Sequence, residues 1–99
     1  MIFPDSHARC QSSATFTVVN DRGLHTRPST ELVKRATGFK SQIHLLYRRQ
    51  EVNAKSLLGI LTLAAPRGAK IKVMAEGEDA AEAVAALLEL ADHSFNFKY

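Results

Sequence analysis

The first helix of this chain is expected to begin within the stretch Gly23-Leu24-His25-Thr26-Arg27-Pro28, and the other elements can be placed outward from it. Proline is tolerated in the first turn of a helix, because the N–H group that it lacks has no partner inside the helix there. The residues after Pro28 are apolar at helical spacing, at Leu32, Val33, Ala36 and Phe39. His25 therefore lies at or beside the residue that caps a helix.

This position predicts an anion site at His25. The N–H groups of a first helical turn and the positive end of the helix dipole attract negative charge. A neutral imidazole is also a nucleophile toward phosphorus, and the resulting phosphoramidate transfers readily. Arg27 would place a guanidinium against the phosphoryl oxygens, and the backbone N–H groups of Thr26 and Arg27 would bind them. A histidine before a helix is also a common capping or surface residue, so spacing alone leaves both interpretations open.

Size and composition limit the chain to one small domain. Its 99 residues, 45% of them hydrophobic, suffice for a single core. No apolar run approaches the roughly 20 residues that span a bilayer, and residues 1–13 lack the apolar segment of a secretory signal. We therefore expect a cytoplasmic protein that does not insert into membranes. The only cysteine is Cys10, which excludes an internal disulfide.

The spacing of the four histidines predicts no metal site and no cofactor. His7, His44 and His93 do not pair with one another, with a carboxylate or with Cys10 at an interval typical of metal ligands. We interpret His7 as part of an N-terminal extension, His44 as a residue on the outer face of a strand, and His93 as a residue that follows the last helix.

The pattern of apolar residues predicts the element order β-α-β-β-α-β-α. The strands alternate apolar and polar residues, and the helices are apolar on one side, which favours an antiparallel sheet covered on one face. The fold class is therefore α+β, an open-faced β-sandwich with a four-stranded antiparallel sheet and three helices on one face. Residues 1–13 are expected to be a flexible extension, 14–91 the domain and 92–99 a tail. The predicted strands are Ala14–Asn20, Ser41–Tyr47, Glu51–Ala54 after a turn at 48–50, and Ala69–Ala75.

Two further helices are expected. Asp79 is predicted to cap the last one, with Glu82 three residues later and an apolar stripe beyond it. Ser56 is predicted to cap a short helix that is apolar almost all round. Because only one face of this helix can be buried, some of its leucines should form an exposed contact patch, unless all of them belong to the core. These leucines are Leu57, Leu58 and Leu61.

Three motifs, in order, resemble those of one known family. The stretch 23–28 resembles the active-site motif of HPr, the histidine-containing phosphocarrier family of the bacterial phosphoenolpyruvate:sugar phosphotransferase system. The segment Asn53-Ala54-Lys55-Ser56-Leu57-Leu58-Gly59 resembles the segment that carries the family's regulatory serine. Glu76-Gly77-Glu78-Asp79 resembles the opening of the family's last helix. The resemblance covers residues 14 to about 91, and the family's open-faced sandwich agrees with the element order predicted above.

The resemblance implies a covalent phosphoryl carrier, not an enzyme. By it, His25 accepts a phosphoryl group from phosphorylated enzyme I and passes it to a histidine of an enzyme IIA domain, with Arg27 as its electrostatic partner. It further implies that an HPr kinase could phosphorylate Ser56 and weaken the encounter with enzyme I, although a serine at this position is often only a helix cap. We expect a monomer whose partners contact Thr26, Leu57, Leu58 and Leu61.

Two alternatives remain open at this point. Ser29 stands where many relatives carry alanine, and the segments Leu61–Ala65 and His93–Phe97 resemble those of the nitrogen-related carrier NPr, whose main output is regulation. From a different class, the net charge of +3 and the β-α-β-β-α-β core would suit a small RNA-binding module. Such a module stacks bases on aromatic residues of its central strands, where this sequence offers only Tyr47.

Overall fold

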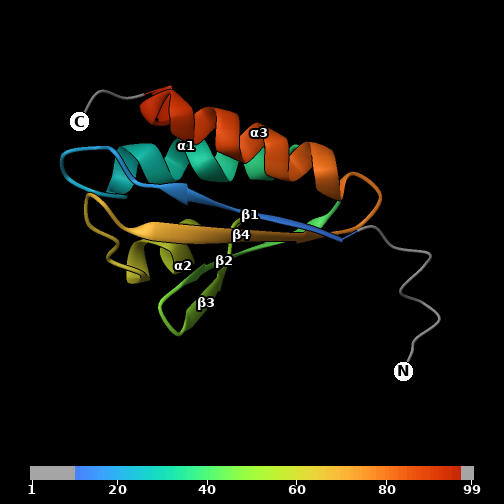
Figure 1. Ribbon diagram of the computed structural model, residues 1–99, viewed down its shortest axis with the longest axis horizontal. Helices are drawn as coiled ribbons and strands as arrows, with labels where there is room; N and C mark the ends of the chain where they lie inside the picture. Colours follow the sequence, from blue (N-terminus) through green and yellow to red (C-terminus); the bar gives the residue numbers. More distant parts are fainter. Residues whose placement is uncertain (1–10, 97–99) are drawn as a thin grey trace.

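The helices and strands follow one another in the predicted order in the computed structural model, which describes residues 11–96 (Figure 1). A short turn after the last helix, η2, is the one addition to that order. The elements are β1 (Gln11–Thr17), α1 (Thr26–Ala36), β2 (Gln42–Tyr47), β3 (Gln50–Asn53), α2 (Leu57–Thr62), β4 (Lys70–Glu76), α3 (Ala80–Asp92) and η2 (Ser94–Asn96). Within the described part, no helix is long and apolar enough to cross a membrane.

The four strands form one antiparallel sheet in the order β1-β4-β2-β3, as the alternating pattern predicts. The register places Leu45 of β2 opposite both Val73 of β4 and Val52 of β3, and Phe16 of β1 opposite Ile71 of β4. Leu45, Val73 and Ile71 are fully buried. These apolar residues share one face of the sheet, and the intervening lysines of β4 lie exposed on the other.

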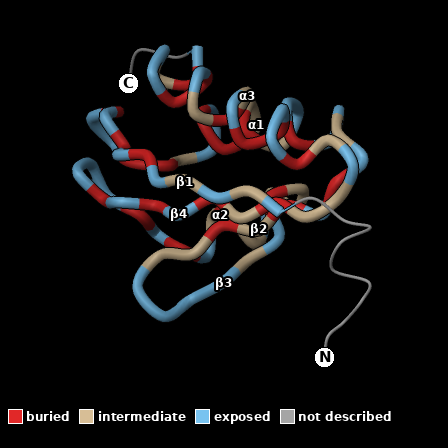
Figure 2. The backbone as a smooth tube through the Cα atoms, turned by 45° about the vertical axis from the view of Figure 1, so that its right-hand side comes forward, coloured by how far each residue is buried: buried red, intermediate tan, exposed pale blue. Residues whose placement is uncertain are grey.

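The helices cover the apolar face of the sheet. Helices α1 and α3 lie side by side over it, and α3 packs against β1 and β4 (Figure 1). Helix α2 packs against α1 and β3, where Val52 lies against Gly59. Because Val52 shares its face with Leu45, all three helices cover the same face, and the predicted open-faced sandwich is confirmed. Figure 2 shows the buried residues gathered between the helices and the sheet.

The first strand begins earlier than predicted. Residues 11–13 were expected in the flexible extension, but they pair with Met74, Ala75 and Glu76 of β4. Gln11, Ser12 and Ser13 are polar, so the apolar alternation that signals a strand is missing there, and backbone pairing with β4 extends the strand instead. The strand ends at Thr17, three residues before the predicted end. His7 and Cys10 lie outside the described residues.

The prediction of a tail at residues 92–99 is wrong for its first residues. Asp92 is the last residue of α3, and residues 94–96 turn back so that Phe95 is fully buried. The Phe95 ring meets Phe16 of β1 edge to face, with ring centroids 5.6 Å apart. Part of the expected tail therefore belongs to the core.

Asp79 occupies the predicted cap position of α3, but its side chain does not cap that helix. Its carboxylate instead accepts hydrogen bonds from the N–H groups of Lys40 and Ser41, each at 2.9 Å, and from the Ser41 hydroxyl. The Ser41 hydroxyl, followed by the Lys40 N–H, lowers the pKa of Asp79 from its ordinary value of 3.8 to about 2. The carboxylate thus ties the start of α3 to the segment that enters β2.

This contact predicts a difference in acid stability between the wild type and the Asp79→Asn variant. The folded protein favours the ionised carboxylate, so its stabilising effect is present above pH 3.8 and is lost as the pH falls through about 2. The unfolding free energy of the variant should therefore fall less than that of the wild type over this range. Urea titrations at a series of pH values measure it, with Asp21→Asn as the exposed control. Parallel curves for the wild type and Asp79→Asn would contradict this role of Asp79.

The C-terminal end of α2 carries a non-glycine residue in the left-handed region, Ala64, with φ of +49°. Glycine is the residue that this position after a helix normally prefers. We expect Ala64→Gly to raise the unfolding free energy by about 0.5–1 kcal/mol. The matched control is Gly68→Ala, since Gly68 has φ of +90° and no atom within 4 Å of an added Cβ. That control should be destabilising through backbone conformation alone. Thermal unfolding of both variants checks the pair, and the same sign of effect in both would refute the explanation.

Candidate functional site

His25 is the residue at which the chain enters α1. Its backbone is extended, with φ of −82° and ψ of −168°, and its carbonyl accepts the first helical hydrogen bond, from the Ser29 N–H at 3.0 Å. The imidazole is half-buried and does not cap the helix. The first N–H groups of an α-helix have no acceptor inside the helix and point out of its start, so those of Thr26 and Arg27 do so here. Both residues are exposed. His25 therefore lies where the sequence predicts an anion site.

Gly23 allows the loop before His25 to lie close to the segment that follows α2. The Leu24 N–H donates to the Ala65 carbonyl at 2.9 Å. A Cβ on Gly23, which has φ of +71°, would lie 2.2 Å from the Ala65 carbonyl oxygen. Any side chain at this position would push the loop off that segment and move His25 with it.

Ser29 provides the donor for a carbonyl that lies just before the helix. The first helical hydrogen bond runs from the Ser29 N–H to the His25 carbonyl, so the Leu24 carbonyl lies one residue outside the helical ladder. The Ser29 hydroxyl donates to this Leu24 carbonyl at 3.0 Å. Both Ser29 and Leu24 are buried. Ser29, which the sequence marks only as a departure from the family pattern, thus fixes the peptide group that precedes His25.

Ser29→Ala should lower the unfolding free energy by about 1–2 kcal/mol, because a buried carbonyl loses its donor. The control is Thr30→Ala, one residue further along, whose hydroxyl makes an exposed bond of 2.7 Å to the Thr26 carbonyl. We expect that control to change stability by less than about 0.5 kcal/mol. Urea unfolding of both variants is the measurement. Equal effects at positions 29 and 30 would show that the Ser29 bond has no special weight.

A hollow of about 400 Å³ lies beside His25. Arg22, His25 and Thr26 line one side of it. Residues from the end of α2 and the segment that follows, namely Leu61, Ala64, Ala65 and Pro66, line the other. The exposed cations near the helix start are Arg22 and Arg27. The imidazole thus lies between these two exposed cations and a mainly apolar wall.

Ser56 caps α2, as predicted, since its hydroxyl oxygen accepts a hydrogen bond from the Gly59 N–H at 3.1 Å. The neighbouring Lys55 donates from Nζ to the Phe39 carbonyl at 2.7 Å. Lys55 therefore connects the start of α2 to the segment after α1. No acidic residue lies in the first turn of α2.

The leucines of α2 differ in burial, because only one face of this short helix packs against the core. Ile60 faces the core and is fully buried, whereas Leu58 is 74% exposed. Leu57 and Leu61 are half-buried. The interpretation that all these leucines belong to the core is therefore wrong for Leu58, and an apolar patch remains on the surface of α2, the helix that packs against α1.

Two residues that support the loop before His25 could not be found from the sequence. Asn20 is fully buried and connects the loop before His25 to the turn after α3, through a bond from Nδ2 to the Ser94 carbonyl at 3.0 Å. Phe95 fills the space beneath that turn. A polar residue in a loop and a lone aromatic residue after a helix have no periodicity, so no sequence signal marks either of them.

The fold and this site together define the class of protein, a small carrier with a histidine at the start of a helix. A family model described as the phosphorylation site of the HPr component of the phosphotransferase system matches residues 12–93. The chain belongs to the HPr family. It is a phosphocarrier of the phosphotransferase system rather than an enzyme.

Solved structures of the family resemble this chain over most of its length. An HPr of Thermoanaerobacter tengcongensis is 38% identical, with 89% of this chain and 99% of the other covered and a TM-score of 0.84. The phosphocarrier protein HPr of Bacillus anthracis is 35% identical, with coverages of 81% and 95% and a TM-score of 0.77. Crh, the catabolite repression protein of Bacillus subtilis, is 34% identical, with coverages of 75% and 85% and a TM-score of 0.68.

The RNA-binding alternative is not supported. Besides the family match, Tyr47 lies on the helix-covered face of β2 with Ile43 and Leu45, so it is not available for stacking on the open face. The described part of that open face on β2 and β4 presents Gln42, His44, Leu46, Lys70, Lys72, Met74 and Glu76, none of which is Phe, Tyr or Trp.

Proposed function

We propose that His25 is the residue that carries the phosphoryl group, accepting it from phosphorylated enzyme I and passing it to a histidine of an enzyme IIA domain. The observation that carries the proposal is the position of the half-buried imidazole at the start of α1, beside the hollow. The imidazole lone pair forms the new P–N bond while the P–N bond to the donor histidine breaks, and the departing donor imidazole takes up a proton. Reversal of these roles delivers the group to the next histidine.

The start of α1 and Arg27 favour the phosphorylated state. The charge on the phosphoryl oxygens develops next to the first-turn N–H groups of Thr26 and Arg27, which a helix start directs toward anions. The guanidinium of Arg27 adds charge-assisted hydrogen bonds to the same oxygens.

We further propose that the exposed patch of α2 is where partners dock and that Ser56 is a regulatory phosphorylation site. Leu61 lines the hollow beside His25, and Leu57 and Leu58 lie on the same short helix, so a partner that covers His25 and the hollow would reach them as well. A phosphate on Ser56 would add negative charge at the edge of this patch, where a kinase specific for HPr would act. Thr26 would lie at the centre of the contact.

Transfer of label from phosphoenolpyruvate tests the role of His25. The wild-type chain is mixed with enzyme I and labelled phosphoenolpyruvate, and the labelled residue is identified by mass spectrometry. A phosphoramidate on His25 is lost in acid and kept in alkali, whereas a phosphoserine survives acid. Label that is stable in acid, or that lies on another histidine, would contradict the proposal.

The same assay separates the sugar branch from the nitrogen branch. We propose sugar transport as the output, since two of the relatives reported above are HPr proteins. Faster labelling by the enzyme I of the sugar system than by its nitrogen-related counterpart is expected, and the reverse order would favour an NPr-like carrier.

We propose that the chain acts as a monomer. A dimer of HPr from Thermoanaerobacter tengcongensis, 40% identical to this chain, has been solved. Sedimentation equilibrium across the concentrations used for transfer tests the monomer. A dimer at the concentration of full activity would overturn it.

A further inference from the structure

The turn that follows α3 has a backbone that side chains other than glycine rarely adopt. Ser94, Phe95 and Asn96 have φ angles of +54°, +57° and +58°, so three consecutive residues lie in the left-handed region. Each of them has a Cβ, and the left-handed region costs such residues conformational energy. The surrounding structure must therefore hold this turn in place.

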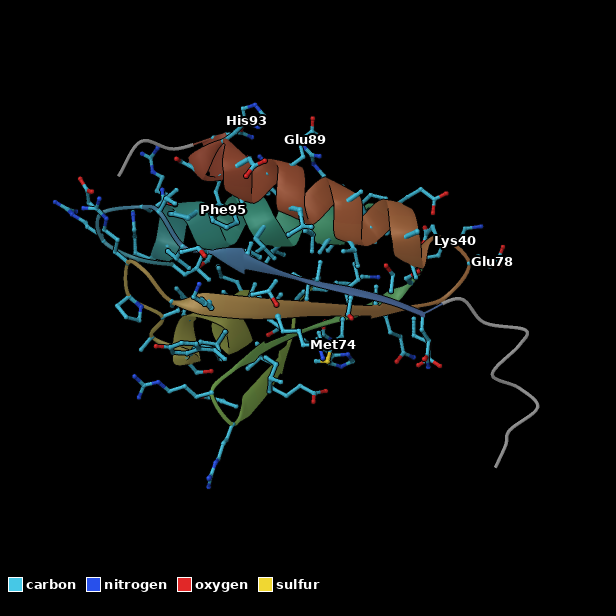
Figure 3. The ribbon with its side chains drawn as sticks, in the orientation of Figure 1. Lys40, Met74, Glu78, Glu89, His93 and Phe95 are labelled. Carbon is cyan, nitrogen blue, oxygen red and sulfur yellow. The ribbon has the colours of Figure 1, made fainter. Side chains whose placement is uncertain are left out.

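Burial of Phe95 is one of the contacts that hold it. The Phe95 side chain points from the end of α3 toward the sheet, whereas His93 points away from it (Figure 3). Phe95 is fully buried and meets the ring of Phe16 edge to face. The turn also packs against α1, the helix that begins after His25.

The second contact leads from the turn to His25. Asn20, whose side chain is fully buried, donates from Nδ2 to the Ser94 carbonyl at 3.0 Å. The main-chain carbonyl of Asn20 accepts from the Gly23 N–H at 2.9 Å, and the Gly23 carbonyl accepts from the His25 N–H at 2.9 Å. Successive hydrogen bonds thus join residue 94 to the backbone of residue 25. The first of them, between Asn20 and Ser94, links residues that are 74 positions apart in the sequence.

We propose that Asn20 is a positioning residue for phosphoryl transfer, and that the turn 94–96 acts through it to set the position of the His25 imidazole. The inference rests on the proposed role of His25 as the phosphoryl carrier. Asn20 touches no phosphoryl group. Asn20 fixes the N-terminal part of the loop 20–25. The Ser29 hydroxyl and the bond from the Leu24 N–H to the Ala65 carbonyl fix the part next to His25. In-line transfer between two proteins requires the imidazole nitrogen at a fixed place and angle, so a loosened loop lowers the rate of the chemical step.

The test is Asn20→Ala in the full chain, with Val73→Ala as a matched control. Val73 is a fully buried residue of β4, outside the loop, so its truncation lowers stability without releasing His25. With enzyme I and phosphoenolpyruvate, we expect kcat for labelling of Asn20→Ala to fall about tenfold or more, with KM little changed. Amide hydrogen exchange at Gly23 and His25 should accelerate in the same variant. The control should keep both the wild-type kcat and the slow exchange at these amides.

A double-mutant cycle tests whether the turn acts through Asn20. Phe95→Leu keeps an apolar side chain in the core but loosens the turn, and it is combined with Asn20→Ala at a temperature where circular dichroism shows every variant folded. If both changes break the same connection, the combined loss in kcat is smaller than the product of the two single losses. Independent, multiplying losses would overturn the role of the turn, and unchanged kcat and exchange in Asn20→Ala would overturn the role of Asn20.

These outcomes are distinguishable from failure of the proposed function. If the wild type takes no label on His25, the proposed function fails, and hydrogen exchange at Gly23 still decides whether Asn20 fixes the loop. If the wild type is labelled on His25 but Asn20→Ala transfers at the wild-type rate, only the inference about Asn20 fails.

Discussion

Replacing His25 with alanine should abolish phosphorylation of this chain by enzyme I. The proposed carrier atom is removed, and no other residue that lines the hollow carries an imidazole, so we expect the labelling rate to fall by at least about a thousandfold. The fold should be retained. Because the half-buried imidazole lies outside the hydrophobic core, its loss should change the unfolding free energy by less than about 1 kcal/mol. Rapid-quench labelling and urea unfolding measure the two quantities.

The other described histidines are the matched controls. His44 lies on the open face of β2, and His93 follows α3 with its Nδ1 2.8 Å from the Glu89 carbonyl. Neither lies at the start of an α-helix, and we expect His44→Ala and His93→Ala to accept label at the wild-type rate. Acid-labile label on the His25→Ala variant, or a large loss in either control, would reject His25 as the carrier.

The position of His25 could be predicted because it depends on local signals. Pro28 fixes where a helix starts, and the helical spacing of Leu32 and Ala36 fixes which side faces the core. The sheet was predictable for a similar reason, since Ile71 and Val73 alternate with exposed lysines. Element order and covered face follow from such periodic patterns. The boundaries of β1 do not, because Gln11 to Ser13 join the sheet through backbone pairing alone.

The supports of the site could not be predicted, because they depend on contacts between distant segments. An aspartate before a helix gives the same sequence signal whether it caps its own helix or, like Asp79, binds the Ser41 segment. The hydroxyl of Ser29 matters because the buried Leu24 carbonyl lies just before α1, outside the helical hydrogen bonds. Asn20 contacts the turn at Phe95 only in the folded protein, where the packing of α3 on β1 brings the two segments together. Single residues of this kind have no period to detect.

Ser56→Asp should weaken transfer from enzyme I while making the protein more stable. Aspartate is also a preferred helix cap, so it can keep the bond that the Ser56 oxygen accepts from the Gly59 N–H. The first turn of α2 contains no acidic residue, and a negative charge there should raise the unfolding free energy by about 0.3–1 kcal/mol. The same charge lies next to Leu57 and the 74% exposed Leu58. A partner whose acidic groups face the exposed Arg22 and Arg27 would then meet a like charge at position 56, and we expect KM to rise about tenfold to a hundredfold.

Ser56→Asn separates charge from capping, since asparagine has nearly the shape of aspartate and caps a helix equally well. We expect this neutral variant to keep the wild-type KM. Ser56→Ala should lose about 1 kcal/mol of stability with its cap and also keep its KM, provided that the cap serves only the fold. Steady-state labelling at two ionic strengths and thermal unfolding measure these effects. The rise in KM of Ser56→Asp should shrink at high salt, because exposed charges are screened. A rise in KM together with a rise in stability, confined to the charged variant, cannot arise from damage to the fold. Equal KM values for the aspartate and asparagine variants would mean that charge at position 56 does not control docking.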